Sequence, residues 1–304
     1  MEKQYLRQVI NYINNTGSLC DKFGCFSKIY NMTTENIYGF LKNYDLKDKR
    51  VLTVSGSGDQ RLNAYFLGAK NVTCFDINPL TKFHMEMKDK AIVNLNFEKF
   101  INFFDIYSRR YGTYYEPLDY RLFDAFKAKL SDETRIFFDY VINSTDVQDY
   151  NIYYGFENNL DMLKNANSYL NPDGFDKMKK IMKDKKVEYI ETEIEELPYI
   201  IKGEKYDMIL LSNISDYIHS IYGVDGLRYF RETIDKLADN LELNGVMQVG
   251  YIYSKYSSFN DVGDFRFKEE RDKYFPSSTF SSVLVDSYGN LDFKDEVITY
   301  QKTK

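Results

Sequence analysis

The feature that most constrains the fold is a strand, glycine turn and helix pattern that begins the stretch 50–79. Residues 51–54 (VLTV) form a short apolar, β-branched run, which is typical of a strand buried on both faces of a parallel sheet. Gly56 and Gly58 follow at once, and residues without a Cβ let the backbone turn sharply and approach a ligand closely. The next residues, Asp59–Leu67, are predicted to be helical.

A second predicted strand, Val72–Phe75, ends at Asp76, which stands 18 residues after Gly58. The glycine turn brings backbone N–H groups and a helix N-terminus to one end of a ligand site. The carboxylate at the end of the second strand can accept both hydroxyl groups of a ribose, and a hydrogen bond to a charged acceptor contributes roughly 1.5–3 kcal/mol. This spacing predicts the nucleoside-binding half of a Rossmann-like α/β fold.

The glycine turn also distinguishes between nucleoside ligands. A dinucleotide fingerprint needs a small residue where this chain has Arg61, and the chain has no phosphate-binding GxxxxGK[ST] motif. The segments VLTVSGSGDQ and FDINP instead resemble motifs I and II of the class I S-adenosyl-L-methionine (SAM) dependent methyltransferases, with Thr53 and Ser55 near the place of that family's usual acidic residue. The resemblance implies SAM as cofactor, bound by Ser55, Gly56, Gly58, Asp76, Ile77 and Asn78.

Two later segments resemble further motifs of the same family. VEYIETEIEELP resembles its third strand, which implies that Glu193 contacts the adenine; the alternative is that this glutamate is simply solvated, like its neighbours. KYDMILLSNISDYI predicts an apolar strand, Met208–Leu211, whose carboxyl end would face a ligand. It resembles motif IV, which implies cofactor contacts from Ser212 and Asn213 and a substrate contact from Tyr217.

Asn213 and His219 are the candidate catalytic residues. Asn213 lies at the carboxyl end of the predicted strand, and His219 lies on the next helix as a candidate general base, a role that the unperturbed pKa of an imidazole suits. The NPPY motif of methyltransferases that act on amino groups of DNA or on glutamine is absent, which disfavours those substrates.

Residues 1–49 precede the first strand and are predicted to form an N-terminal helical lid. Thr33 or Thr34 is suited to cap a helix whose apolar face would be Ile37, Phe40, Leu41 and Tyr44. Helices in this place often lie over the cleft in the resembled family, which implies substrate contacts from Tyr30 and Thr34 and lid positions for Thr33 and Glu35. A capped core helix without a ligand is the alternative.

Residues 95–184 show periodic apolar segments and no strong strand pattern, so they are predicted to be a helical insertion subdomain beside the cleft. Such an insertion can also be purely structural. Within it, Asn171–Gly174 is predicted to be a turn and Phe175–Lys185 a helix.

The Rossmann-like SAM-binding domain is then predicted to comprise residues 50–94 and 185–304. Its later part contains a predicted helix, Leu227–Leu241, and strands at Phe280–Val285 and Glu296–Tyr300 that would form an antiparallel edge hairpin. The predicted sheet has seven strands and is mostly parallel.

Composition narrows the classes of partner. The net charge of −6 disfavours nonspecific nucleic-acid binding, which depends on Lys and Arg. Cys20, Cys25 and Cys74 have neither disulfide nor metal spacing, and His84 lacks partners for a metal site. The chain begins without a signal-peptide pattern and contains no run near the roughly 18 apolar residues of a membrane span. We expect a cytoplasmic protein with no metal, nucleic-acid partner or membrane span.

The resemblance implies a methyltransferase that moves a methyl group from SAM to a small-molecule acceptor by in-line displacement. Such an enzyme mainly holds the nucleophile and the methyl carbon in line. The segment 51–79 is also similar to the SAM:diacylglycerol 3-amino-3-carboxypropyl transferases, which is a second interpretation. A noncatalytic SAM-binding or partner-binding module is a third. The sequence does not predict the acceptor or the oligomeric state.

Overall fold

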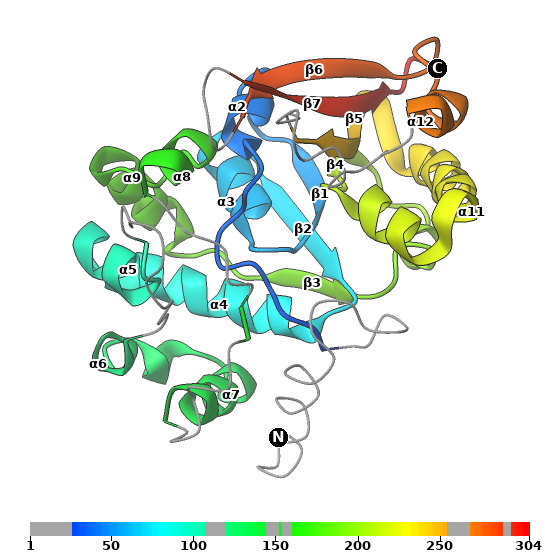
Figure 1. Ribbon diagram of the computed structural model, residues 1–304. Coiled ribbons are helices and arrows are strands. Elements are labelled where there is room, and N and C mark those ends of the chain that lie inside the picture. The colour runs from blue at the N-terminus through cyan, green and yellow to red at the C-terminus, as the bar shows by residue number, and fades with distance from the viewer. Residues whose placement is uncertain (1–25, 107–118, 144–151, 154–159, 254–267, 288–292) are drawn as a thin grey trace.

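The computed structural model describes residues 26–106, 119–143, 152–153, 160–253, 268–287 and 293–304. The first 25 residues of the predicted N-terminal lid, with Cys20 and Cys25, lie outside this part of the chain. The described residues form a central sheet with helices on both faces (Figure 1).

Seven strands of the described chain form one sheet in the order β3-β2-β1-β4-β5-β7-β6 (Figure 1). The strands are β1 (Arg50–Val54), β2 (Asn71–Asp76), β3 (Glu188–Glu191), β4 (Tyr206–Leu210), β5 (Leu241–Ile252), β6 (Ser281–Asp286) and β7 (Lys294–Gln301). β1 to β5 pair in parallel, whereas β7 is antiparallel to both β5 and β6. This arrangement confirms the predicted Rossmann-like sheet, mostly parallel with an antiparallel edge hairpin.

The two faces of the sheet pack against different helices. Val51 belongs to one apolar core and Leu52 to the other, and both are fully buried, as expected for a strand covered on both sides. The first layer contains α2 (Ile37–Leu41), α3 (Asp59–Phe66), α4 (Pro79–Asn94) and α9 (Pro172–Met182). The second contains α10 (Leu197–Ile200), α11 (Ile214–Leu237) and α12 (Lys268–Tyr274). The short η3 (Ala238–Asn240) follows α11.

The segment 95–184 forms short helices that share the first core. Besides α9 they are α5 (Phe97–Phe103), α6 (Tyr120–Phe123), η1 (Lys127–Lys129), α7 (Asp132–Asn143) and α8 (Leu160–Ala166). The ring of Phe100 lies 4.8 Å from that of Phe104 and 5.1 Å from that of Phe175, between centroids. All three belong to the same buried cluster as Val51 of β1. The predicted domain boundaries remain a prediction.

Two predicted local structures are wrong at helix starts. Asn36, rather than Thr33 or Thr34, caps α2, because its side chain accepts a hydrogen bond from the backbone N–H of Gly39 at 2.8 Å.

The second concerns α9. Asn171–Gly174 is the start of this helix rather than a turn, since the side chain of Asn171 accepts the N–H of Gly174 at 2.9 Å and Pro172 occupies the first helical position.

The helix predicted over Leu227–Leu241 is the second half of a longer one. α11 begins at Ile214, and Gly223, whose φ of 61° is not helical, separates its two halves. Leu241 already belongs to β5. Of the helices in the described residues, including this long one, none has the length and apolar character to cross a membrane.

Candidate functional site

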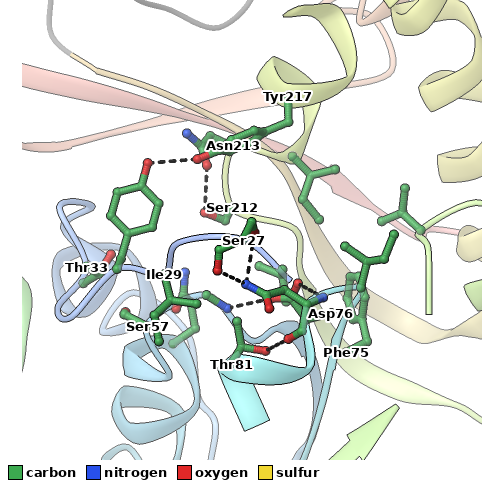
Figure 2. A pocket seen from close by; sticks show the side chains of 18 of the residues that line it. Ser27, Ile29, Thr33, Ser57, Phe75, Asp76, Thr81, Ser212, Asn213 and Tyr217 are labelled. Carbon is green, nitrogen blue, oxygen red and sulfur yellow. Dashed lines mark hydrogen bonds between the residues drawn. The ribbon is translucent and has the colours of Figure 1, made fainter. Parts of the chain in front are cut away.

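A cavity of about 230 Å³ opens at the carboxyl ends of the central strands (Figure 2). Most of the predicted site residues line it: Tyr30, Thr34, Gly56, Asp76, Ile77, Asn78, Glu193, Ser212, Asn213 and Tyr217. Ser55, Gly58 and His219 are not among the described residues that line it. Segments far apart in the sequence therefore meet where open parallel sheets bind ligands.

The glycine turn after β1 lines the cavity through Gly56 and Ser57. Gly56 and Gly58 have φ values of 47° and 80°, a conformation that favours glycine. A Cβ at Gly58 would lie 2.8 Å from Cγ of Met85, so this glycine lets the turn pack on α4. Ser55 is buried, and its backbone N–H donates to the carbonyl of Phe75 at 2.8 Å. Ser55 and Gly58 thus shape the turn, while Gly56 and Ser57 face the cavity.

Asp76, at the end of β2, joins this turn to the next one. Its carboxylate accepts the backbone N–H of Gly56 at 3.2 Å and that of Asn78 at 3.0 Å. Burial raises the pKa of Asp76 to about 6, although these backbone donors act in the opposite direction. The carboxylate therefore has a fixed orientation at the cavity wall and is ionised at neutral pH.

Asn78 links α4 to the N-terminal segment. Its side-chain oxygen accepts the N–H of Leu80 at 3.1 Å, which caps the helix as predicted, and its side-chain N–H₂ donates to the carbonyl of Ser27 at 2.8 Å. The side chain of Asn78 thus caps α4 and also holds Ser27, which lines the cavity.

Glu193 lies in the loop after β3, on the side of the cavity next to Asp76. The backbone N–H of Thr192 donates to the carbonyl of Asp76 at 3.0 Å, which fixes this loop beside β2. Tyr189 of β3 strengthens the same junction, because its hydroxyl lies 3.1 and 3.0 Å from the carbonyl oxygens of Asp76 and Asn78, within hydrogen-bond distance of both. Sequence reasoning did not single out Tyr189.

The end of β4 is held in an unusual backbone conformation. Ser212 has a φ of 54°, which is uncommon for a residue with a side chain. The side chain of Gln248 in β5 stabilises it by accepting the N–H of Ser212 at 2.7 Å and donating to its carbonyl at 2.8 Å. Sequence reasoning missed Gln248, because nothing in an apolar strand pattern marks one glutamine for this role. His219 lies further along α11 and is 8% exposed.

The three predicted substrate residues, Tyr30, Thr34 and Tyr217, line the same cavity as Ser212. The hydroxyls of Tyr30 and Tyr217 are 2.9 Å apart, which joins the N-terminal segment to α11 (Figure 2). Oγ1 of Thr34 lies 3.0 Å from the hydroxyl of Tyr253, just beyond β5. Glu35, which is 2% exposed and also lines the cavity, accepts a hydrogen bond from Oγ of Ser212. This end of the cavity is therefore lined by hydroxyl groups and one carboxylate.

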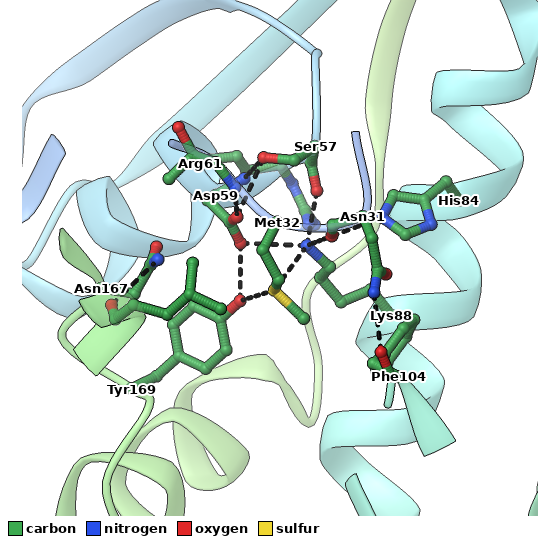
Figure 3. Close-up of polar contacts among 12 residues, drawn as sticks. Asn31, Met32, Ser57, Asp59, Arg61, His84, Lys88, Phe104, Asn167 and Tyr169 are labelled. Carbon is green, nitrogen blue, oxygen red and sulfur yellow. Dashed lines mark hydrogen bonds and ion pairs between the residues drawn. The ribbon is translucent and has the colours of Figure 1, made fainter. Parts of the chain in front are cut away.

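A buried polar cluster, defined by Asp59 and Lys88, lies behind the glycine turn (Figure 3). The carboxylate of Asp59 accepts the N–H of Thr33 at 2.6 Å, the hydroxyl of Ser57 at 2.9 Å and that of Tyr169 at 2.6 Å. The ammonium of Lys88 lies 3.0 Å from the same carboxylate. The cluster therefore joins the N-terminal segment, the glycine turn, α4 and the 95–184 segment.

Lys88 completes the cluster through backbone contacts. Its ammonium donates to the carbonyls of Asn31 at 2.8 Å and Ser57 at 2.7 Å. Burial lowers the pKa of Lys88, while Asp59 opposes that shift. His84 lies nearby and contacts the carbonyl of Asn31 at 3.2 Å and the hydroxyl of Tyr153 at 3.1 Å. Burial and the charge of Lys88 lower the pKa of His84 well below its usual value, and its ring packs against those of Phe104 and Tyr153.

Arg61 shows how the fold accepts a large residue on α3. Its side chain is 1% exposed and forms an ion pair with Asp89 of α4 at 2.8 Å. It also donates to the carbonyl of Lys186 at 3.2 Å, just before β3. The large side chain of Arg61 is thus accommodated between α3 and α4, where its ion pair contributes to their packing.

Comparisons with known proteins give matches at the level of structure alone. No protein-family model matches the chain, and a search of the curated proteins finds no match. A candidate SAM-dependent methyltransferase from Streptococcus mutans is 11% identical, with a TM-score of 0.41, over 87% of this chain and 47% of its own. The chain thus spans about half the length of that protein.

Two further solved structures are similar over more of their own length. An rRNA methylase from Streptococcus thermophilus is 11% identical, with a TM-score of 0.37, over 88% of this chain and 93% of its own. The magnesium protoporphyrin IX methyltransferase from Synechocystis PCC 6803 is 10% identical, with a TM-score of 0.39, over 88% of this chain and 76% of its own.

Proposed function

We propose that this chain, which has the class I SAM-dependent methyltransferase fold, binds SAM in the cavity and transfers its methyl group to a small-molecule acceptor. The observation that carries the proposal is the contact between the glycine turn and the end of β2, where the N–H of Gly56 donates to the carboxylate of Asp76 at 3.2 Å. A ligand that spans both elements can place the hydroxyls of a ribose on the carboxylate and a polar tail on the turn. SAM supplies both.

The residues around the cavity fit this cofactor. A Cβ added at Gly56 would meet only Gln60, at 4.0 Å, so the cavity side of the turn has room for a ligand. We assign Asp76 to the ribose and Glu193 to the adenine, with Ile77 beside them. Gly56 and Ser57 would then hold the methionine end, which leaves the end of β4 for the methyl group.

The main contribution of the chain's own residues would be to position the two reactants. When bound, SAM supplies an electrophilic methyl carbon on a sulfonium centre. Ser212, held by Gln248, and Asn213 would fix the acceptor side of that centre, and holding two reactants in line accounts for a large part of such catalysis. The apolar residues Phe75, Ile194 and Ile218 line the same cavity and would exclude water.

Calorimetric titration with SAM and with S-adenosylhomocysteine tests the cofactor site. We expect the wild type to bind both, and Asp76→Ala to weaken binding by about 100-fold, since two hydrogen bonds to a carboxylate contribute about 1.5 kcal/mol each. Glu191→Ala is the matched control, because Glu191 lies on β3 at the position that pairs with Asp76 of β2, but its side chain is exposed. A wild-type protein that binds neither compound would contradict the proposal.

Product analysis then separates the proposed reaction from the two other interpretations. Methyl transfer releases S-adenosylhomocysteine, whereas transfer of the 3-amino-3-carboxypropyl group releases methylthioadenosine. Chromatography of a SAM-loaded reaction with candidate acceptors identifies which of the two accumulates. Tight SAM binding with neither product would favour a noncatalytic module.

A further inference from the structure

The acceptor end of the cavity follows from the assignment of SAM, so this inference rests on the proposed function. Asp76 and Glu193 belong to the β2 and β3 side of the sheet, and Ser212 and Tyr253 follow β4 and β5 on the other side. A cofactor that begins at Asp76 and passes over Gly56 therefore points its reactive end toward Ser212. The acceptor must lie beyond it, over the ends of β4 and β5.

The groups in that region are hydroxyls and one carboxylate. Tyr30 and Tyr217 present a hydrogen-bonded pair of phenols, and Tyr253 is joined to Thr34. Glu35 lines the same cavity, and its carboxylate accepts a hydrogen bond from Oγ of Ser212. Phenol rings and carboxylates both attract cations.

The charges around the whole cavity point the same way. Among the described residues that line it, Lys28 is the one cationic side chain, whereas Glu35, Asp76 and Glu193 are acidic. Lys28 follows Ser27, whose carbonyl accepts a hydrogen bond from the side chain of Asn78 at the β2 end. A carboxylate or phosphate at the acceptor end would meet the like charge of Glu35, and Lys28 is the one cation among the described lining residues that could offset it.

We propose that Glu35 is the centre of an ammonium-binding subsite and that the acceptor is a small amine. The carboxylate of Glu35 binds the protonated nitrogen, and the phenols of Tyr30, Tyr217 and Tyr253 surround it. A carboxylate in this place can also take the proton that an ammonium group must lose before its nitrogen becomes nucleophilic. Glu35 then selects amines over alcohols and acids of the same shape.

Equilibrium binding to the protein loaded with S-adenosylhomocysteine tests this subsite without turnover. The probes are benzylamine, benzyl alcohol and benzoate, which share one ring and differ in the polar group. We expect benzylamine to bind at least tenfold more tightly than the other two. Glu35→Gln should remove that preference, while its affinities for benzyl alcohol and for S-adenosylhomocysteine stay within about twofold of wild type. Those two affinities also serve as the test that the variant is folded.

Glu191→Gln, which changes an exposed carboxylate, is the matched control and should retain the preference for benzylamine. Equal or tighter binding of benzyl alcohol or benzoate would overturn the inference, and so would the absence of benzylamine binding to the loaded wild type. If Glu35→Gln instead weakens the binding of S-adenosylhomocysteine by tenfold or more, Glu35 binds the ammonium group of the cofactor and the inference is wrong. A wild type that does not bind S-adenosylhomocysteine at all is a failure of the proposed function itself.

Discussion

At the scale of single residues, the raised pKa of Asp76 predicts that cofactor binding depends on pH. Its burial raises its pKa to about 6, but a ribose needs the ionised form as hydrogen-bond acceptor. We therefore expect the affinity for S-adenosylhomocysteine to be constant above pH 7 and to fall as the pH decreases below 6, by about tenfold per pH unit. Calorimetry between pH 5 and pH 8 measures this. Asp76→Asn should bind weakly with no such dependence, and a wild-type affinity that is unchanged at pH 5 would contradict the assignment.

Lys88 gives a second prediction at this scale. It is 1% exposed and its partner Asp59 is fully buried, so Lys88→Met would leave a buried carboxylate without its cation. We expect a loss of about 3–5 kcal/mol in the free energy of unfolding, measured by urea denaturation. Lys164→Met, which removes one side of the exposed Lys164–Asp161 pair, should change it by less than about 1 kcal/mol. Equal effects of the two substitutions would show that the buried cluster does not stabilise the fold.

The sequence could predict that Asp76 lies at the end of a strand beside the glycine turn, but not that Asp59 and Lys88 form a buried ion pair. Asp76 stands at a diagnostic distance from a glycine turn, whereas a lone Asp and a lone Lys on helices are usually solvated. Their partners, Thr33 and Tyr169, lie 26 and 110 residues from Asp59 along the chain. No local pattern records such contacts.

At the scale of elements, the turn between β1 and α3 can be tested with a matched pair of glycines. Gly58 and Gly203 have φ values of 80° and 87°, so alanine costs roughly 1–2 kcal/mol at either from backbone strain. A Cβ at Gly203 meets nothing within 4 Å, whereas one at Gly58 lies 2.8 Å from Cγ of Met85. We expect Gly58→Ala to lose about 1–3 kcal/mol more than Gly203→Ala in urea denaturation. Equal losses would mean that the contact with α4 does not constrain the turn.

The same scale shows why α4 could be predicted from the sequence while the start of α9 could not. Both helices begin with an Asn-Pro pair, at Asn78 and at Asn171. In the second case Gly174 makes the sequence look like a turn. The structure shows another reason for this glycine, since a Cβ there would lie 2.2 Å from the carbonyl of Ser168. Gly174 is therefore required by tertiary packing, which cannot be inferred from the local sequence.

At the scale of the whole molecule, the mostly parallel sheet and its antiparallel edge hairpin could be predicted, because most of the strands have an apolar pattern. The strand order was not predicted, and β2 and β3 are neighbours in the sheet although residues 77–187 separate them along the chain. The position of the N-terminal segment over the cavity could be proposed only by resemblance. Its contacts with Asp59, Asn78 and Ser212 join segments that are distant in the sequence. The packing of residues 95–184 is equally nonlocal.

The shared core leads to a prediction about cooperativity. Phe100 and Phe175 of the 95–184 segment belong to the same buried cluster as Val51 and Cys74 of the sheet, and Tyr169 donates to Asp59 behind the glycine turn. A segment that shares its core with the sheet should not unfold independently of it. We expect one calorimetric transition for the chain. S-adenosylhomocysteine at 100 times its Kd adds about 2.7 kcal/mol of stability, which should raise the Tm of that whole transition by about 5 °C. Two transitions, of which the ligand moves only one, would instead make residues 95–184 an independent subdomain.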